Sequence, residues 1–72
     1  MDAKKIGKFI AGKRKELNMS QKDLAKHLHI TDKAISKWER GLSFPDITIL
    51  IPLSEVLEVS LYDLLVGGSD NE

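Results

Sequence analysis

Four polar side chains between residues 32 and 40 have the chemistry to hydrogen-bond a nucleic acid. Lys33, Ser36, Lys37 and Arg40 fall at offsets 0, 3, 4 and 7, the spacing of a single face on an α-helix. Lysine and arginine donate to phosphate oxygens and to guanine O6 and N7, and serine can donate or accept. A charged stripe of this kind is also common on a helix that only faces water. The rest of the sequence must therefore distinguish a nucleic-acid-binding face from an ordinary solvent-exposed one.

The distribution of charge along the chain favours the nucleic-acid interpretation. Eleven Lys and Arg balance eleven Asp and Glu over the 72 residues, so the formal net charge is zero. All eleven bases lie in residues 1–40 beside five acids, which gives +6, whereas residues 41–72 hold six acids and no base, which gives −6. Such a contrast between two halves points to a nucleic acid or another acidic surface as partner.

Other chemistries find no support in the sequence. The chain has no cysteine, which excludes disulfides, thiolate zinc sites and a cysteine nucleophile. His27 and His29 could ligate a metal, but no third ligand of a suitable type lies near them. No nucleophile stands with a base, and Gly7 and Gly12 fall within an expected helix rather than in a phosphate-binding loop. We therefore expect no enzyme, no catalytic residue, no metal, no cofactor and no small-molecule substrate.

Apolar residues recur at helical spacing in five short segments, which predicts an all-α domain. This domain must position the polar stripe formed by Lys33, Ser36, Lys37 and Arg40. Helices are expected at about residues 3–17, 21–28, 32–40, 47–57 and 61–66. Capping residues mark their ends. The N-terminal signals are Ser20 with Asp23, Thr31, Asp46 and Ser60 with Asp63, and the C-terminal signals are Asn18, Gly41 and Gly67. A chain this short has no room for a second core, so we expect one compact five-helix bundle.

Residues 47–51 have a competing interpretation. The run Ile-Thr-Ile-Leu-Ile is β-branched enough for a strand, and Pro52 would remove a helical hydrogen bond. A strand needs a partner, however, and no second strand-like run exists in the sequence. A helix over residues 47–57 is therefore favoured, with apolar groups nearly all round it as in a buried central helix.

The second and third expected helices are separated by only two or three residues around His29 and Ile30. So short a connection suits a sharp, near-perpendicular turn, the geometry of a helix-turn-helix. Ala25 is small where the two helices would cross, and Ile35 and Trp38 share the face opposite the polar stripe. The pattern therefore buries one side of the third helix and leaves the stripe at the surface.

Three stretches resemble the Cro and phage-repressor type of helix-turn-helix regulator, often called XRE. They are SQKDLA at residues 20–25, ITDKAISKWERG at 30–41 and PD at 45–46, and the resemblance covers residues 6 to about 66. It implies a lambda-repressor-like five-helix domain whose third helix enters the major groove of double-stranded DNA. It also implies a transcriptional regulator of bacterial or phage type, acting as a repressor, and a cytoplasmic location is expected because the N-terminus has no apolar segment typical of a secretory signal.

The resemblance assigns roles to individual side chains. Gln21 matches a glutamine that hydrogen-bonds a DNA phosphate, and Arg40 matches a contact to the DNA backbone. Arg14 and Glu39 match a partly buried ion pair and are expected to be structural. Asp32, Lys33 and Lys37 match positions whose side chains contact the DNA bases in the family. The expected DNA-binding set is Gln21, Thr31, Asp32, Lys33, Ser36, Lys37 and Arg40.

Two features qualify these assignments. Asp32 could accept a hydrogen bond from cytosine N4, or it could only complement the dipole of its helix, and both interpretations stay open. His29 and Glu58 stand where relatives commonly have glycine, so each is expected to take a positive φ.

The resemblance also bears on assembly and domain limits. One domain of this size buries only about 600–1,000 Å² on DNA, so we expect a homodimer on a near-palindromic site. The alternative function is a protein-interaction module with the same fold, which would use the acidic half and the apolar residues Leu61, Tyr62, Leu65 and Val66. No segment suits a membrane span. The domain is expected to cover residues 1–66, with residues 67–72 as a flexible tail or linker stub.

Overall fold

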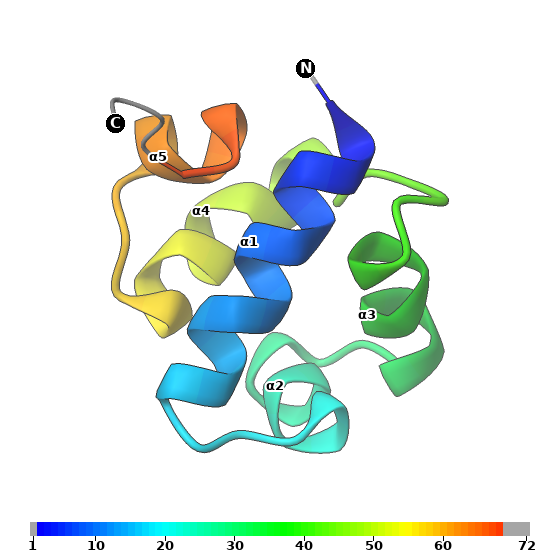
Figure 1. The fold of residues 1–72 in the computed structure, drawn as a ribbon. Helices are drawn as coiled ribbons and strands as arrows, with labels where there is room; N and C mark the ends of the chain where they lie inside the picture. Colours follow the sequence, from blue (N-terminus) through cyan, green and yellow to red (C-terminus); the bar gives the residue numbers. More distant parts are fainter. Residues whose placement is uncertain (1, 69–72) are drawn as a thin grey trace.

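The computed structural model describes residues 2–68, and these form a bundle of five α-helices, as the sequence predicts. The helices are α1 (Ala3–Glu16), α2 (Gln21–Leu28), α3 (Asp32–Glu39), α4 (Ile47–Leu57) and α5 (Leu61–Val66). Figure 1 shows α1 crossing in front of α4, with α3 on one side, α2 below and α5 above on the other side. Leu17 and Arg40, which we expected inside helices, are instead the C-cap residues of α1 and α3.

The strand interpretation of residues 47–51 is wrong, because residues 47–57 form one α-helix that includes Pro52. The Asp46 carboxylate caps its start by accepting from the Thr48 backbone N–H at 3.1 Å. Near the proline, the Ser54 hydroxyl donates to the Ile51 carbonyl at 2.7 Å. Burial of Leu53 and Leu57 in the common core outweighs the local preference of β-branched residues for a strand.

The N-terminal capping signals form as expected. Ser20 and Asp23 make a complete capping box, with the Ser20 N–H donating to the Asp23 carboxylate at 2.9 Å and the Asp23 N–H donating to Ser20 Oγ at 3.0 Å. The hydrogen bonds from Ser20 hold the pKa of the Asp23 carboxyl below its usual value. Ser60 likewise accepts from the Asp63 N–H at 3.0 Å. Local sequence thus determines where α2 and α5 begin.

Three residues other than glycine follow the ends of helices in the left-handed backbone conformation. Asn18, His29 and Glu58 have φ of 59°, 58° and 61°, which confirms the positive φ expected at each. Gly41 and Gly67 also have positive φ, at 74° and 78°. These residues turn the chain sharply enough for consecutive helices to pack on one another.

Every helix contributes at least one fully buried aliphatic side chain to a single core. Each such side chain adds about 1.5–3 kcal/mol to the free energy of unfolding. Trp38 is only 5% exposed, so it packs in this core. The fully buried side chains are Ile10, Leu24, Ile35, Leu53, Leu57 and Leu64.

Gly7 is buried where α1 crosses α3. A Cβ atom at this position would lie 2.1 Å from the Trp38 carbonyl oxygen and 3.0 Å from the Glu39 carbonyl oxygen. The two backbones are therefore in direct contact, and only glycine fits between them. Sequence reasoning did not predict this contact between helices, since Gly7 resembles any other glycine in a helix.

The end of the described chain packs against α1. A Cβ atom at Gly67 would lie 2.8 Å from Lys5 Cγ, and one at Gly68 would lie 2.8 Å from Phe9 Cδ1. Gly67 and Gly68 thus lie against the domain, and residues 69–72 of the expected tail fall outside the described residues. Among the described helices, none has the length and apolar character needed to cross a bilayer.

Candidate nucleic-acid interface

The turn between α2 and α3 holds these helices in the geometry of a helix-turn-helix. His29 adopts the left-handed conformation, and the Ile30 N–H donates to the Ala25 carbonyl at 3.1 Å. Ala25 is 4% exposed and Ile30 is half-buried, so the turn is anchored in the core. The Thr31 hydroxyl then accepts from the Ala34 N–H at 3.3 Å and starts α3. Thr31 therefore serves as a cap in the free protein.

The polar stripe of α3 is exposed as predicted. Ile35 and Trp38 are buried, and Lys33 and Lys37 on the other face point to solvent. Arg40 adjoins them, and its Nε donates to Ser36 Oγ at 3.2 Å and to the Ser36 carbonyl at 3.3 Å. The structure therefore brings all four residues to one surface, although the Ser36 hydroxyl is already engaged by Arg40.

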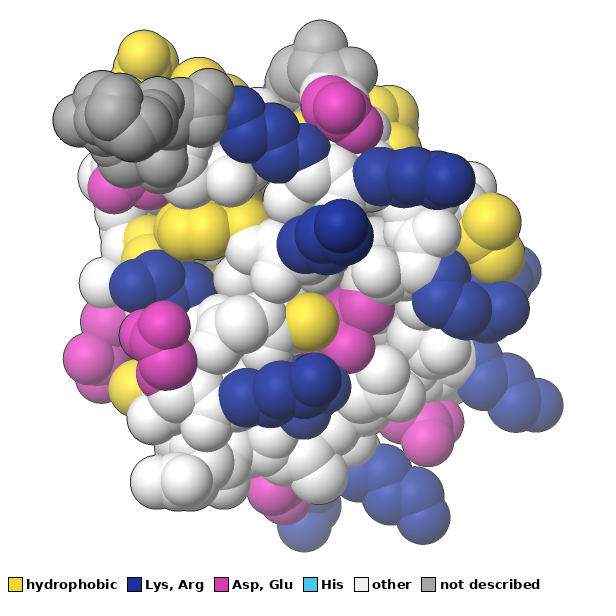
Figure 2. Space-filling model, viewed as in Figure 1, with side chains coloured by type: hydrophobic (Ala, Val, Ile, Leu, Met, Phe, Trp, Pro, Cys, Tyr) yellow, Lys and Arg dark blue, Asp and Glu magenta, His cyan; other side chains and the backbone are white. Residues whose placement is uncertain are grey.

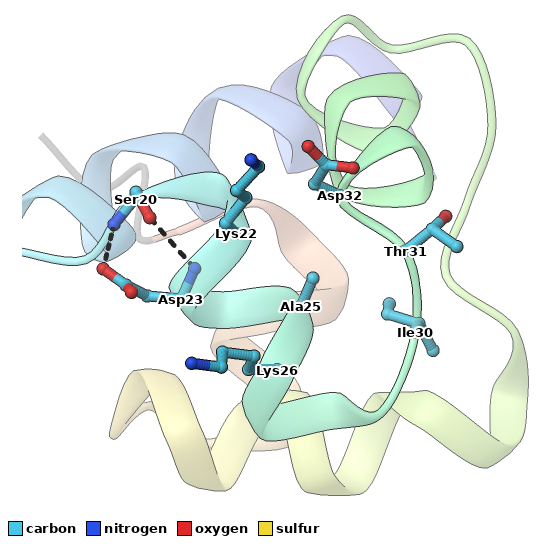
Figure 3. A pocket seen from close by; sticks show the side chains of 8 residues that line it. All are labelled: Ser20, Lys22, Asp23, Ala25, Lys26, Ile30, Thr31 and Asp32. Carbon is cyan, nitrogen blue, oxygen red and sulfur yellow. Dashed lines mark hydrogen bonds between the residues drawn. The ribbon is translucent and has the colours of Figure 1, made fainter.

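Asp32 lies on the rim of an open pocket of about 600 Å³ between α2 and the start of α3. In Figure 3, Lys22 extends from α2 and Asp32 from the start of α3, and Ala25 and Ile30 lie between α2 and the turn. Asp32 sits in the first turn of α3, where a carboxylate complements the helix dipole. Asp32 thus complements the helix dipole and also lines the open pocket.

Gln21 belongs to a hydrogen-bonded network that the resemblance did not include. Its Nε2 donates to Glu39 Oε1 at 2.9 Å. Glu39 also accepts from Arg14, with Nε at 2.7 Å from Oε2 and Nη2 at 3.0 Å from Oε1, so the expected ion pair is bidentate. Arg14 Nη1 donates further to the Met19 carbonyl at 2.8 Å. Side chains of α1, α2 and α3 thus meet at the Glu39 carboxylate, and Arg14 also ties the loop before α2 to this network.

The Arg14 and Glu39 side chains are only 10% and 9% exposed. The hydrogen bond to Glu39 raises the pKa of the Arg14 guanidinium above its usual value, and burial opposes this shift only in part. The protein therefore favours the charged form of Arg14, and its positive charge compensates the Glu39 carboxylate.

The loop after α3 extends the same surface toward the start of α1. The Leu42 N–H donates to the Lys37 carbonyl at 2.9 Å, and a Cβ atom at Gly41 would lie 2.6 Å from Lys4 Cγ. Lys4 is thus a basic residue beside the loop that sequence reasoning did not assign to the surface. Figure 2 shows Lys and Arg side chains gathering over α1 and along the side where α3 lies.

A family model described as helix-turn-helix matches residues 10–64, which is most of the chain. The chain belongs to this family. Its resemblance to the Cro and phage-repressor type is thereby confirmed. The helix-turn-helix chain is 42% identical over 67 residues to the HTH-type transcriptional regulator DicA of Escherichia coli K12. That match covers 93% of this chain and 50% of DicA, so the chain spans about half the length of that relative.

Two solved structures with bound DNA share this helix-turn-helix fold. The P22 c2 repressor in complex with a synthetic operator superimposes with a TM-score of 0.82 at 37% identity, covering 86% of this chain and 94% of that one. SinR, named a master regulator of biofilm formation and also solved with DNA, superimposes with a TM-score of 0.76 at 38% identity, covering 83% and 97%. The lambda-repressor-like fold is thus confirmed, and the family is one of regulators rather than enzymes.

The histidines of this helix-turn-helix domain are not gathered into a metal site. Over residues 2–68, no group of three or more His, Cys, Asp or Glu side chains is arranged to hold a metal ion. His27 and His29 are both exposed near the end of α2. The surface of α3 instead presents the cationic side chains of Lys33, Lys37 and Arg40, which can donate hydrogen bonds to a ligand.

Proposed function

We propose that this chain binds double-stranded DNA sequence-specifically as a transcriptional regulator, a repressor in the cytoplasm, with α3 in the major groove. The observation that carries the proposal is the outward stripe of Lys33, Lys37 and Arg40, opposite the buried Ile35 and Trp38. An α-helix with its side chains is about 10–12 Å in diameter, so α3 fits in the major groove, which is about 12 Å wide. P22 c2 and SinR, which share this fold and were solved in complex with DNA, support DNA binding by this chain.

Each side chain in the proposed interface has a distinct task. Lys33 and Lys37 donate to guanine O6 and N7, and Asp32 accepts from cytosine N4. Gln21 at the N-terminus of α2 and Arg40 at the C-terminus of α3 bind phosphates on either side of the groove, which sets register without reading sequence. The alternative of a module that binds only proteins has no comparable support.

A second copy of the chain is part of this proposal. One such domain buries only about 600–1,000 Å² on DNA, too little for strong discrimination between DNA sequences. Two copies on one site double the number of base pairs that the protein contacts. Ile47 and Ile51, one turn apart on α4, are 78% and 57% exposed, and Tyr62 on α5 is 73% exposed. These apolar side chains are available to a neighbouring protomer.

Fluorescence anisotropy with mixed genomic duplexes tests the proposal directly. Because lysines and arginines displace counterions from the phosphates, affinity should fall by at least tenfold between about 50 and 200 mM salt. Duplexes selected from a random pool should then contain two inverted half-sites whose centres lie about 10–10.5 base pairs apart, or a multiple of that. Absence of binding at about 50 mM salt with tens of micromolar protein would contradict DNA binding, and a lone half-site would contradict the dimer.

Lysine and glutamine substitutions should separate base reading from phosphate contact. Lys33→Ala and Lys37→Ala are each expected to reduce discrimination between the selected site and its variants by about 1–3 kcal/mol, because a guanine loses its donor. Gln21→Ala should weaken binding to all duplexes by a similar factor. Competition binding against a panel of single-base variants measures both effects.

Lys8→Ala is the matched control for these lysine variants. Lys8 is an exposed lysine of α1 that lines the crease beside Gly67 and Gly68 and is not one of the expected DNA-binding residues, and its removal changes the net charge by the same amount. It should leave base preference unchanged. Altered preference in Gln21→Ala together with unaltered preference in both lysine variants would contradict the proposed docking.

A further inference from the structure

The side chain of Gln21 is hydrogen-bonded within the protein, with no DNA present. Its Nε2 donates one hydrogen to Glu39 Oε1 at 2.9 Å, and the residue is only half-buried at the start of α2. A glutamine amide has two N–H donors, so one hydrogen remains available. An exposed glutamine without such a partner would sample several rotamers, and binding would have to select one of them.

The acceptor of this hydrogen bond, Glu39, is itself held by further hydrogen bonds. Glu39 receives two bonds from Arg14, at 2.7 and 3.0 Å, and Arg14 is tied to the Met19 carbonyl at 2.8 Å. With about a tenth of each side chain exposed, neither Arg14 nor Glu39 can rotate away without losing these contacts. Arg14 also cancels the charge of the carboxylate, so Glu39 can hold Gln21 near a phosphate without repelling the DNA.

Two backbone donors lie beside the Gln21 amide. The first N–H groups of an α-helix have no partner within the helix, and those of Gln21 and Lys22 make no hydrogen bond within residues 2–68. The next N–H, that of Asp23, is taken by Ser20 Oγ. The start of α2 therefore offers a small group of donors at the positive end of the helix.

We propose that Glu39, held by Arg14, is a positioning residue that presets the Gln21 amide for a DNA phosphate. The inference rests on the DNA binding proposed above and adds a role for the ion pair beyond stability. Glu39 fixes the Gln21 side chain so that its second N–H, together with the backbone N–H groups of Gln21 and Lys22, reaches one phosphate. Gln21 therefore loses its rotamer freedom when the protein folds. The entropic cost of ordering this side chain then does not weaken DNA binding.

Amide relaxation in the free protein tests the first half of the proposal. Gln21 is the sole glutamine of the chain, so its side-chain NH₂ signal can be assigned without ambiguity. We expect its ¹⁵N order parameter to approach the value of about 0.85 typical of a rigid backbone, and to fall below about 0.6 in the double variant Arg14→Met/Glu39→Met. A mobile Gln21 amide in the unmodified protein overturns the proposal, and this readout stands even where the double variant fails to fold.

DNA affinity tests the second half through a double-mutant cycle. Gln21→Ala should weaken binding to a nonspecific duplex by about 3–10-fold in the unmodified protein and by less than about twofold in the Arg14→Met/Glu39→Met background. Equal losses in the two backgrounds, with the unmodified protein binding DNA, overturn the positioning role and leave the proposed function intact. An unmodified protein that fails to bind at low salt overturns the proposed function, while the relaxation data still report whether Glu39 fixes the amide.

Discussion

Gly7→Ala is expected to lower the free energy of unfolding by about 3 kcal/mol, at the upper end of the usual cost of overpacking. The new Cβ atom would stand 2.1 Å from the Trp38 carbonyl oxygen. That oxygen belongs to the backbone of α3, so it cannot rotate aside as a flexible side chain would. Relief requires α1 to move away from α3, which opens the core around Ile10 and Ile35. Urea unfolding, followed by far-ultraviolet circular dichroism and the fluorescence of Trp38, measures the loss.

Gly12→Ala is the matched control, five residues further along α1. A Cβ atom at Gly12 meets nothing within 4 Å, and the residue is exposed on a regular helix. Alanine should therefore raise the free energy of unfolding by about 0.5–1 kcal/mol, through its better helix propensity. The same substitution thus has opposite signs at two positions of one helix. Equal effects at Gly7 and Gly12 would contradict the close crossing of α1 and α3.

The features that sequence reasoning predicted are those that depend on residues close together in the chain. The capping box of Ser20 and Asp23 spans three positions, and the left-handed turn at Asn18 follows from where an apolar pattern stops, whereas the one at His29 was expected from the resemblance. The outward stripe on α3 follows in the same way from helical periodicity. Local geometry is enough in each case, and the structure agrees.

The features that it missed depend on contacts between distant parts of the chain. Gly7 meets α3 across 31 positions, and Gln21 meets Glu39 across 18. Neither contact has a periodic or capping signature, because helix crossings are set by packing of the whole core. The bond between Arg40 and Ser36 is different, since it spans four positions on one helix and could have been anticipated from that spacing.

Arg14→Met is expected to cost about 3–5 kcal/mol of stability, the largest loss among these substitutions. Without the guanidinium, the Glu39 carboxylate keeps only the hydrogen bond from Gln21, although its side chain is 9% exposed. The Met19 carbonyl also loses its donor, which loosens the loop before α2. An unpaired buried charge has no compensation for the water it has given up, so the cost exceeds the net value of the intact pair.

The double variant Arg14→Met/Glu39→Met should therefore regain most of that loss, because it removes the stranded charge together with its partner. Urea unfolding of the unmodified protein, both single variants and the double variant gives the coupling between the two residues. Lys13→Met is the control, since Lys13 forms an exposed pair with Glu16 at 3.3 Å on the same helix and should change stability by less than about 0.5 kcal/mol. If Arg14→Met were as mild as Lys13→Met, the pair at Glu39 would be solvated, and it could not hold the start of α2 in place.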